Sequence, residues 1–202
     1  MSNSFRLSRR ESPLSLRHGA MLLLCFLATT VAPLAHAESK AVVRTASMAL
    51  DTTQDVYELD AKVDITLPED ARKGIEAGLT LRLTYEIELY RVRRFMLDAT
   101  VATLEQASEL SYHALSQRYL VRNLNTGEQQ DFGTLQAALE ALGDLRGLPV
   151  IDSDLVEKGP AYEGRMRAVV DLSTTPDALK WLLFWSDDWS ITSEWFTWPF
   201  RP

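Results

Sequence analysis

The sequence predicts a mostly-β or α+β domain made of antiparallel strands, either a β-sandwich or one curved sheet with about three short helices. Tyr57–Leu67 and Leu79–Leu89 alternate apolar and polar residues at period two, which is typical of strands with one buried and one solvated face. The 202-residue chain is 46% hydrophobic and 24% charged, which excludes a disordered, collagen-like or polytopic membrane protein. The order of the expected elements argues against a doubly wound parallel sheet.

Further strands are expected on both sides of this pair. The apolar positions of Phe95–Ala114 change parity along the segment, so one extra residue near Ala102 should form a bulge or a break. A turn at Asn125-Thr126-Gly127 joins two shorter strands. The other expected strands are Val42–Leu50, Tyr119–Leu124, Glu128–Phe132, Tyr162–Leu172 and a C-terminal strand through Trp189–Trp198.

Three short helices are expected between the strands. Pro68–Gly78 starts with a proline and two acidic residues and ends at a glycine. Thr134–Gly143 begins at a threonine N-cap and has apolar residues along one stripe. Thr175–Trp185 opens with the string Thr-Pro-Asp and completes the set.

The N-terminal segment is predicted to be a secretory signal peptide, residues 1–37, cleaved after Ala37. A basic start precedes the uncharged run Ala20–Leu34, and Ala35-His36-Ala37 forms an A-x-A cleavage pattern. Residues 38–202 would then be a single exported β-rich domain in the periplasm, without a transmembrane span. The alternative is an uncleaved segment that anchors the chain in the inner membrane, although the run is shorter than the roughly 18 residues of a spanning helix.

Charge and residue content argue against several functions. A net charge of −7 disfavours a nucleic-acid partner, because phosphate repels an acidic domain without a dedicated basic face. Cys25, the single cysteine, lies in the expected leader, and beyond the leader His113 is the single histidine, which leaves too few ligands for a zinc site. The sequence has no nucleophile elbow, phosphate loop or dinucleotide motif. We therefore expect no enzyme activity, no cofactor and no metal.

Three weaker candidates for chemistry remain. Asp152, Asp154 and Glu157 could attract calcium, but a solvated acidic loop is the simpler interpretation without the EF-hand glycine. Asp187-Asp188 could act as a carboxylate pair in hydrolysis, although such pairs more often cap a helix or meet water. His113 has no evident nucleophile partner and is expected to be structural.

Arg91, Arg93 and Arg94 form the one dense basic cluster of this acidic domain, at the end of the strand Leu79–Leu89. Guanidinium groups in such a cluster bind anions, lipid headgroups or an acidic partner. The alternative is a strand-end turn in which the arginines neutralise nearby carboxylates, namely Glu86, Glu88 and Asp98.

The five tryptophans gather near the C-terminus, at Trp181, Trp185, Trp189, Trp195 and Trp198. Alternation places Trp189 and Trp195 on one strand face and Trp198 on the other. Such a strand either closes the core or exposes one set of aromatic rings as a protein or membrane-interface contact. These three tryptophans therefore join the three arginines as candidate partner-binding residues.

Several of these segments together resemble a family of secreted proteobacterial proteins, catalogued as domain of unknown function 4390. The resemblance rests on the strings Leu89–Arg94 and Leu110–Leu115 followed by Tyr119, the helix from Thr134, and Ser186–Trp189 with Trp195 and Trp198. It implies no activity, catalytic residue or cofactor. Members are often encoded beside membrane sensor kinases, so the resemblance implies a link to envelope sensing.

The expected function is that of an exported, non-enzymatic binding or accessory domain of the bacterial cell envelope, with an envelope protein or the membrane surface as partner. The alternative is a carrier that holds an apolar or lipid ligand between sheet and helices. A carboxylate-based hydrolase that uses Asp187 and Asp188 is the least favoured. The oligomeric state is left open.

Overall fold

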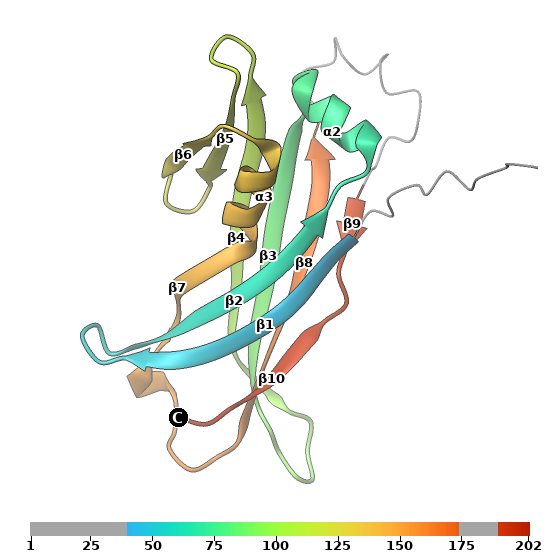
Figure 1. Cartoon of the computed structure of the whole chain (residues 1–202). Coiled ribbons are helices and arrows are strands. Elements are labelled where there is room, and N and C mark those ends of the chain that lie inside the picture. Colours follow the sequence, from blue (N-terminus) through green and yellow to red (C-terminus); the bar gives the residue numbers. More distant parts are fainter. Residues whose placement is uncertain (1–39, 174–189) are drawn as a thin grey trace, which may run out of the picture. The chain divides into compact units, whose positions relative to one another are not determined.

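The computed structural model describes residues 40–173 and 190–202 (Figure 1). Internal contacts divide the chain into a unit of residues 1–35 and a unit of residues 36–202, and every described residue belongs to the second unit. The expected leader and the expected helix Thr175–Trp185 lie outside the described residues. Within these two ranges, no helix combines the length and the apolar character needed to cross a membrane.

The described residues form ten strands, two α-helices and one 3-10 turn. The helices α2 (Glu69–Glu76) and α3 (Leu135–Gly143) lie where the sequence predicts them, so this part of the chain has two helices where about three were expected overall. The strands are β1 (Lys40–Asp51), β2 (Val56–Thr66), β3 (Thr80–Arg91), β4 (Ala99–His113), β5 (Arg118–Asn123), β6 (Gln129–Phe132), β7 (Asp144–Asp152), β8 (Tyr162–Ser173), β9 (Ser190–Thr192) and β10 (Phe196–Phe200). The 3-10 turn η1 (Ser153–Leu155) follows β7.

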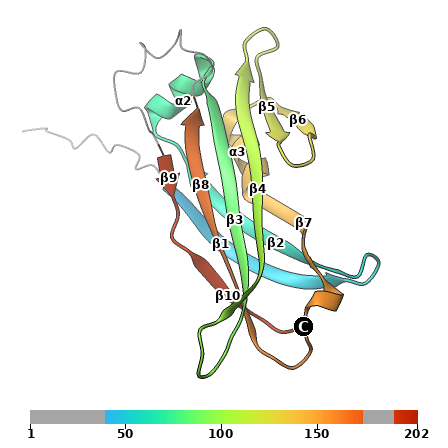
Figure 2. The ribbon, with the colours of Figure 1, turned by 180° about the vertical axis from the view of Figure 1, so that it is seen from behind.

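All strand pairs are antiparallel, as predicted, and they form two open sheets. The small sheet has the order β1-β2-β7, and the large sheet has the order β10-β8-β3-β4-β5-β6, with β9 also paired to β8. Both ribbon views show the small sheet running across one face of the large sheet (Figures 1 and 2). The domain is therefore mostly β, in a sandwich-like arrangement of two layers.

The hydrophobic core lies between the two sheets and against the inner sides of α2 and α3. On β2 and β3 the residues predicted to face inward are buried, except Ile65, which is half-buried, while their neighbours are exposed or half-buried, which confirms both period-two strands. The largest fully buried side chains of the described residues come from both sheets and from the region of α2: Leu59, Leu67, Ile75, Leu81, Leu83, Ile87, Leu89, Leu110, Met166 and Val170.

The irregularity predicted for the long strand before His113 is confirmed. Leu89 of β3 pairs with Ala102, whereas the next residue, Tyr90, pairs with Thr100, so β4 holds one extra residue at this point. The predicted start of the strand is wrong, because β4 begins at Ala99 and not at Phe95. Its partner β3 ends at Arg91, so the residues before Ala99 have no strand to pair with on that side.

Strand β7 is an element that the sequence analysis did not predict. Gly147, which adopts a φ of 58°, and Pro149 interrupt any alternation. The register of β7 against β2 shifts twice along the pair. As an edge strand of the small sheet, β7 tolerates these breaks because one side of its backbone needs no partner. Asp152, predicted to lie in an acidic loop, belongs to this strand.

The C-terminal segment forms two short strands rather than one. β9 and β10 both pair with β8, and the buried residue Ser193 lies between them. The backbone N–H of Ser193 donates to the carbonyl of Ala168 at 2.8 Å, and the Ser193 hydroxyl accepts from the Ala168 N–H at 2.9 Å. The side chain thus replaces a ladder hydrogen bond, which explains why the strand is interrupted there.

Trp198 on β10 packs into the core. Its side chain is 6% exposed and lies opposite Gly164 of β8. A Cβ atom at position 164 would lie 2.3 Å from the indole ring, so glycine is required here for space.

We expect Gly164→Ala to lower the free energy of unfolding by about 1–3 kcal/mol, the usual cost of overpacking a core. Urea unfolding followed by circular dichroism measures the change. Gly133→Ala is the matched control, because its Cβ would meet only the guanidinium of Arg118, 3.9 Å away. Equal stabilities of the two variants would contradict the packing of Trp198 on Gly164.

Candidate functional site

The connection from β3 to β4, residues 92–98, carries most of the large apolar side chains that the described structure exposes. We call it the tip loop. Phe95 is 96% exposed, Leu97 92% and Met96 68%, and Val92 at the base of the loop is partly exposed as well. Exposed apolar side chains usually occur singly, so three consecutive ones on one loop mark a candidate contact surface.

The base of the tip loop is held to the neighbouring β7–β8 connection. The backbone N–H of Val92 donates to the carbonyl of Ala161 at 2.9 Å, and Arg91 forms an ion pair with Glu157 at 2.7 Å. Inside the loop, the N–H of Arg93 donates to the Asp98 carboxylate at 2.9 Å. Figure 2 shows both connections extending beyond the sheets at the same end of the domain.

The structure divides the predicted arginine cluster into two parts. Arg91 is neutralised by Glu157, which lies in the segment predicted as an acidic loop. In the part of the chain that the structure describes, the guanidinium groups of Arg93 and Arg94 form no ion pair. Two unpaired arginines therefore stand directly before the exposed apolar residues of the tip loop.

The carboxylates that the alternative interpretation pairs with the guanidinium groups of this cluster contact other groups. Glu86 pairs with Arg167 at 2.7 Å and Glu88 pairs with Arg165 at 2.5 Å, on the face of the large sheet that points away from the core. Asp98 accepts the backbone N–H of Arg93 and not a guanidinium.

The candidate tryptophans do not share one surface. Trp195 lies on the outer face of the large sheet, with Arg165 and Arg167 over its ring at 4.5 and 4.6 Å from the centroid. Trp198 lies in the core. Trp189, like Trp181 and Trp185, lies outside the described residues. Only Trp195 of the described tryptophans is thus available to a partner, and two arginines already stack on it.

The outer face of β3 and β8 is a network of paired charges and rings. Tyr90 donates a hydrogen bond to Glu88, and Arg165 stacks on the Tyr90 ring at 4.6 Å. The hydrogen bond from Tyr90, together with the hydrogen bond and charge of Arg165, lowers the pKa of Glu88. Because Glu86, Glu88, Arg165 and Arg167 are paired across β3 and β8, this network serves the stability and register of the sheet.

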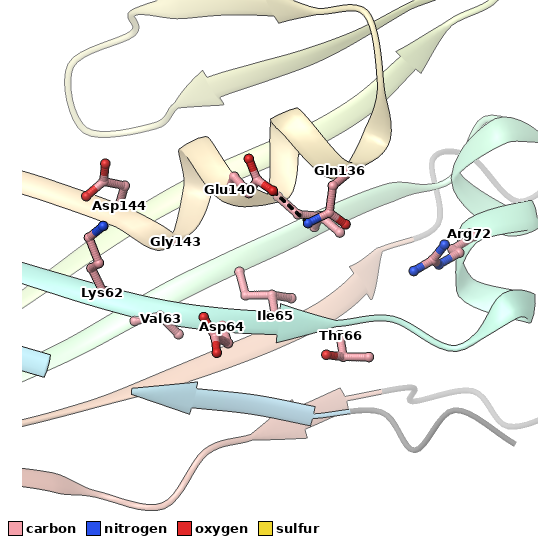
Figure 3. A pocket seen from close by; sticks show the side chains of 11 residues that line it. Lys62, Val63, Asp64, Ile65, Thr66, Arg72, Gln136, Glu140, Gly143 and Asp144 are labelled. Atoms are coloured by element: carbon pink, nitrogen blue, oxygen red, sulfur yellow. Dashed lines mark hydrogen bonds between the residues drawn. The ribbon is translucent and has the colours of Figure 1, made fainter. Parts of the chain in front are cut away.

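A hollow of about 480 Å³ opens between the end of β2 and α3 (Figure 3). Gly143 lets the helix approach the strand closely, since a Cβ there would lie 2.1 Å from the carbonyl oxygen of Val63. Most of the charged and polar groups around the hollow are already engaged, in the pairs Asp64–Arg44, Asp144–Arg146 and Gln136–Glu140. The hollow is a polar surface depression, and two of its carboxylates, Asp64 and Asp144, are neutralised by arginines.

A second hollow, of about 440 Å³, lies between the strands β3 to β6 and the segment from α3 to β7. Tyr85 lines it, buried, and its hydroxyl donates to the carbonyl of Leu142 at 2.9 Å. Burial raises the pKa of Tyr85, so the phenol remains a neutral donor that ties α3 to the large sheet. Amide and hydroxyl side chains contribute much of the remaining lining, among them Gln106, Ser108, Asn123, Thr126 and Gln130.

The other candidates from the sequence are placed apart from one another. His113 is exposed at the end of β4, and its Nδ1 lies 2.8 Å from the hydroxyl of Ser116 in the following turn. Asp187 and Asp188 lie outside the described residues. Among residues 40–173 and 190–202, no group of three or more His, Cys, Asp or Glu side chains is placed to hold a metal ion.

Comparison with known proteins assigns the chain to a family. The family model described as "Domain of unknown function (DUF4390)" matches residues 39–199. The chain belongs to the DUF4390 family. Neither the search of curated proteins nor the search of solved structures finds a match to the DUF4390 chain.

The exposed apolar residues in the tip loop of this DUF4390 domain were not predicted from the sequence as a contact site. Phe95 and Leu97 were assigned to a strand because they are apolar and spaced by two, although Met96 between them is equally apolar. Three adjacent bulky apolar residues between Arg94 and Asp98 do not alternate, and this was the available signal for a loop.

We expect Phe95→Ser and Leu97→Ser to change the free energy of unfolding by less than about 0.5 kcal/mol, because both side chains are exposed. Leu89→Ala, on the same hairpin but fully buried, should cost about 2–5 kcal/mol. Urea unfolding of the three variants measures this. A large loss of stability in either tip-loop variant would mean that the loop serves the fold.

The acid side of the stability profile should depend on Glu88. Because the pKa of Glu88 is lowered in the folded state, its carboxylate stabilises the fold above its unfolded pKa, and this is lost as the pH falls through the folded pKa. Glu88→Gln should therefore cost about 1 kcal/mol at neutral pH, and its difference from the parent should shrink on acidification. Unfolding at a series of pH values tests this, with Glu105→Gln, an exposed carboxylate on β4, as the control. If the free energies of unfolding of Glu88→Gln and the parent differed by the same amount at every pH, this would contradict the lowered pKa of Glu88.

Proposed function

We propose that this DUF4390 domain is an exported, non-enzymatic binding or accessory domain of the bacterial cell envelope, and that the tip loop is its contact element. The observation that carries the proposal is the joint exposure of Phe95, Met96 and Leu97 beside two arginines that form no ion pair with any described residue. Of the partner-binding residues predicted from the sequence, the proposal uses Arg93 and Arg94, and it adds the apolar side chains of the tip loop.

Leaving these apolar side chains in water has a free-energy cost, and burial against a partner would remove it. Each Phe, Met or Leu side chain left in water forgoes about 1.5–3 kcal/mol of burial. The domain has a large core elsewhere and keeps these residues out of it. Loops held by a rigid scaffold are the usual place for binding residues, and the tip loop is held by Arg91, Val92 and Asp98 at its base.

Export of the domain is supported by the basic start, the uncharged run and the A-x-A string of the first 37 residues. The family match begins at residue 39, close after Ala37, which supports a domain boundary there. We place the domain in the periplasm, where contact with an envelope protein or with the membrane surface fits a role in envelope sensing. An uncleaved anchor in the inner membrane would leave the domain in the same compartment.

The other candidate functions have weaker support. The first hollow is polar, the second is lined by polar and apolar side chains in similar measure, and both are open to the surface, which does not favour a carrier of an apolar ligand between sheet and helices. A hydrolase would depend on Asp187 and Asp188, which lie outside the described residues.

The proposal is tested by photo-cross-linking in the living cell. A photoreactive phenylalanine analogue at position 95 should yield adducts with the partner, because this side chain is the most exposed of the tip loop. The same analogue at position 115 is the matched control. Leu115 is 94% exposed but lies in the turn between β4 and β5, at the other end of β4.

Adducts that form at position 95 and not at position 115, whether with lipid or with protein, support the proposed contact element. Absence of adducts at position 95, or the same adducts at both positions, refutes it.

A further inference from the structure

We propose that the partner surface is an anionic lipid bilayer, into which the tip loop inserts Phe95, Met96 and Leu97 while Arg93 and Arg94 bind lipid phosphates. The inference rests on the proposed function and names the partner of the same site. It follows from the geometry of the loop, from its charges and from the way in which its base is held.

The geometry of the loop favours a fluid partner. Phe95, Met96 and Leu97 are consecutive residues in the connection between two antiparallel strands, and their exposed fractions are 96%, 68% and 92%. A flat or rigid protein surface could cover one side of such a protrusion, whereas the interfacial layer of a membrane surrounds it and buries all three side chains at once.

The charges of the loop suit an anionic surface. Arg93 and Arg94 stand immediately before the apolar residues, and neither forms an ion pair within the described part of the chain. Arginine side chains near a membrane keep their guanidinium groups at the level of the phosphates while their stems cover apolar surface. The chain as a whole carries a net charge of −7, whereas the tip loop, with two arginines and Asp98, carries a net positive charge that favours contact with an anionic membrane.

Contacts at the base of the tip loop hold it in place on the domain. The ion pair Arg91–Glu157 and the hydrogen bond from Val92 to Ala161 fix the loop on the β7–β8 connection. An ordered loop loses little conformational entropy when it inserts. Leu155, in η1 of that connection, is 65% exposed and offers a further apolar contact at the same end.

The test measures whether one side chain of the tip loop, in the full chain, enters the membrane of lipid vesicles. An environment-sensitive fluorophore is attached to Leu97→Cys in a Cys25→Ser background, because Cys25 is the only native cysteine. The matched control carries the same fluorophore at Leu115→Cys. Vesicles contain phosphatidylcholine, either alone or mixed with phosphatidylglycerol. This local readout responds to insertion of the tip loop even if the N-terminal segment also binds the vesicle.

We expect the fluorophore at position 97 to shift to shorter wavelength on vesicles with phosphatidylglycerol, while the fluorophore at position 115 does not shift. Phe95→Ser in the labelled chain should weaken the effect by about tenfold or more, the equivalent of one buried aromatic side chain. Arg93→Ala and Arg94→Ala should each weaken it by about fivefold on the anionic vesicles alone. Arg122→Ala, an exposed arginine on β5, is the control for charge.

No shift at position 97, equal shifts at both positions, or a shift insensitive to Phe95→Ser and the arginine changes would overturn the lipid assignment. If cross-linking from position 95 then captures a protein, the proposed contact element stands and only its lipid partner is refuted. If cross-linking from position 95 also fails, both are refuted.

Discussion

The antiparallel pairing of β3 with both of its neighbours is the constraint on which the rest of the structure depends. β3 is bonded along its whole length to β8 on one side and to β4 on the other. Its inward residues, from Leu81 to Leu89, are buried under the small sheet and α3. Central strands with one apolar face admit a single register, since a slip of one residue would expose the entire face. The end of the β3–β4 hairpin therefore determines the position of the tip loop.

The outer face of β3 and the tip loop that follows it differ in whether their charged side chains form ion pairs. On its outer face, Glu86 and Glu88 pair with arginines of β8, and Trp195 lies under those guanidinium groups. Beyond Arg91 the pairing stops, and the next two arginines have no carboxylate to meet in the described structure. A charged side chain that already has an ion-pair partner gains little free energy from binding a ligand. Unpaired arginines beside exposed apolar side chains can instead make both ionic and apolar contacts with a ligand.

Parts of the fold that depend on local patterning could be predicted from the sequence. The extra residue in β4 was visible as a change of parity, because successive side chains of a strand alternate between its faces. Strand β7 was missed because Gly147 and Pro149 disturb its pattern, and an edge strand is held by its one neighbour rather than by its own alternation. At the candidate site, the sequence predicted Arg93 and Arg94 as contact residues. It wrongly placed Phe95 and Leu97 in a strand, because the partner strand β3 ends at Arg91, before it could pair with them.

The sequence by itself determined which faces of the main strands are apolar, where α2 and α3 begin, and that a basic cluster follows β3. These properties depend on neighbours a few residues away. The tertiary structure alone decided which arginine of the cluster is neutralised, because Glu157 is remote from Arg91 in the chain and adjacent to it in space. It also decided that Trp198 is buried, since the space for its ring exists only where Gly164 on another strand lacks a side chain. Contacts between distant segments, and hence the residues left free for a partner, arise only when the sheets pack.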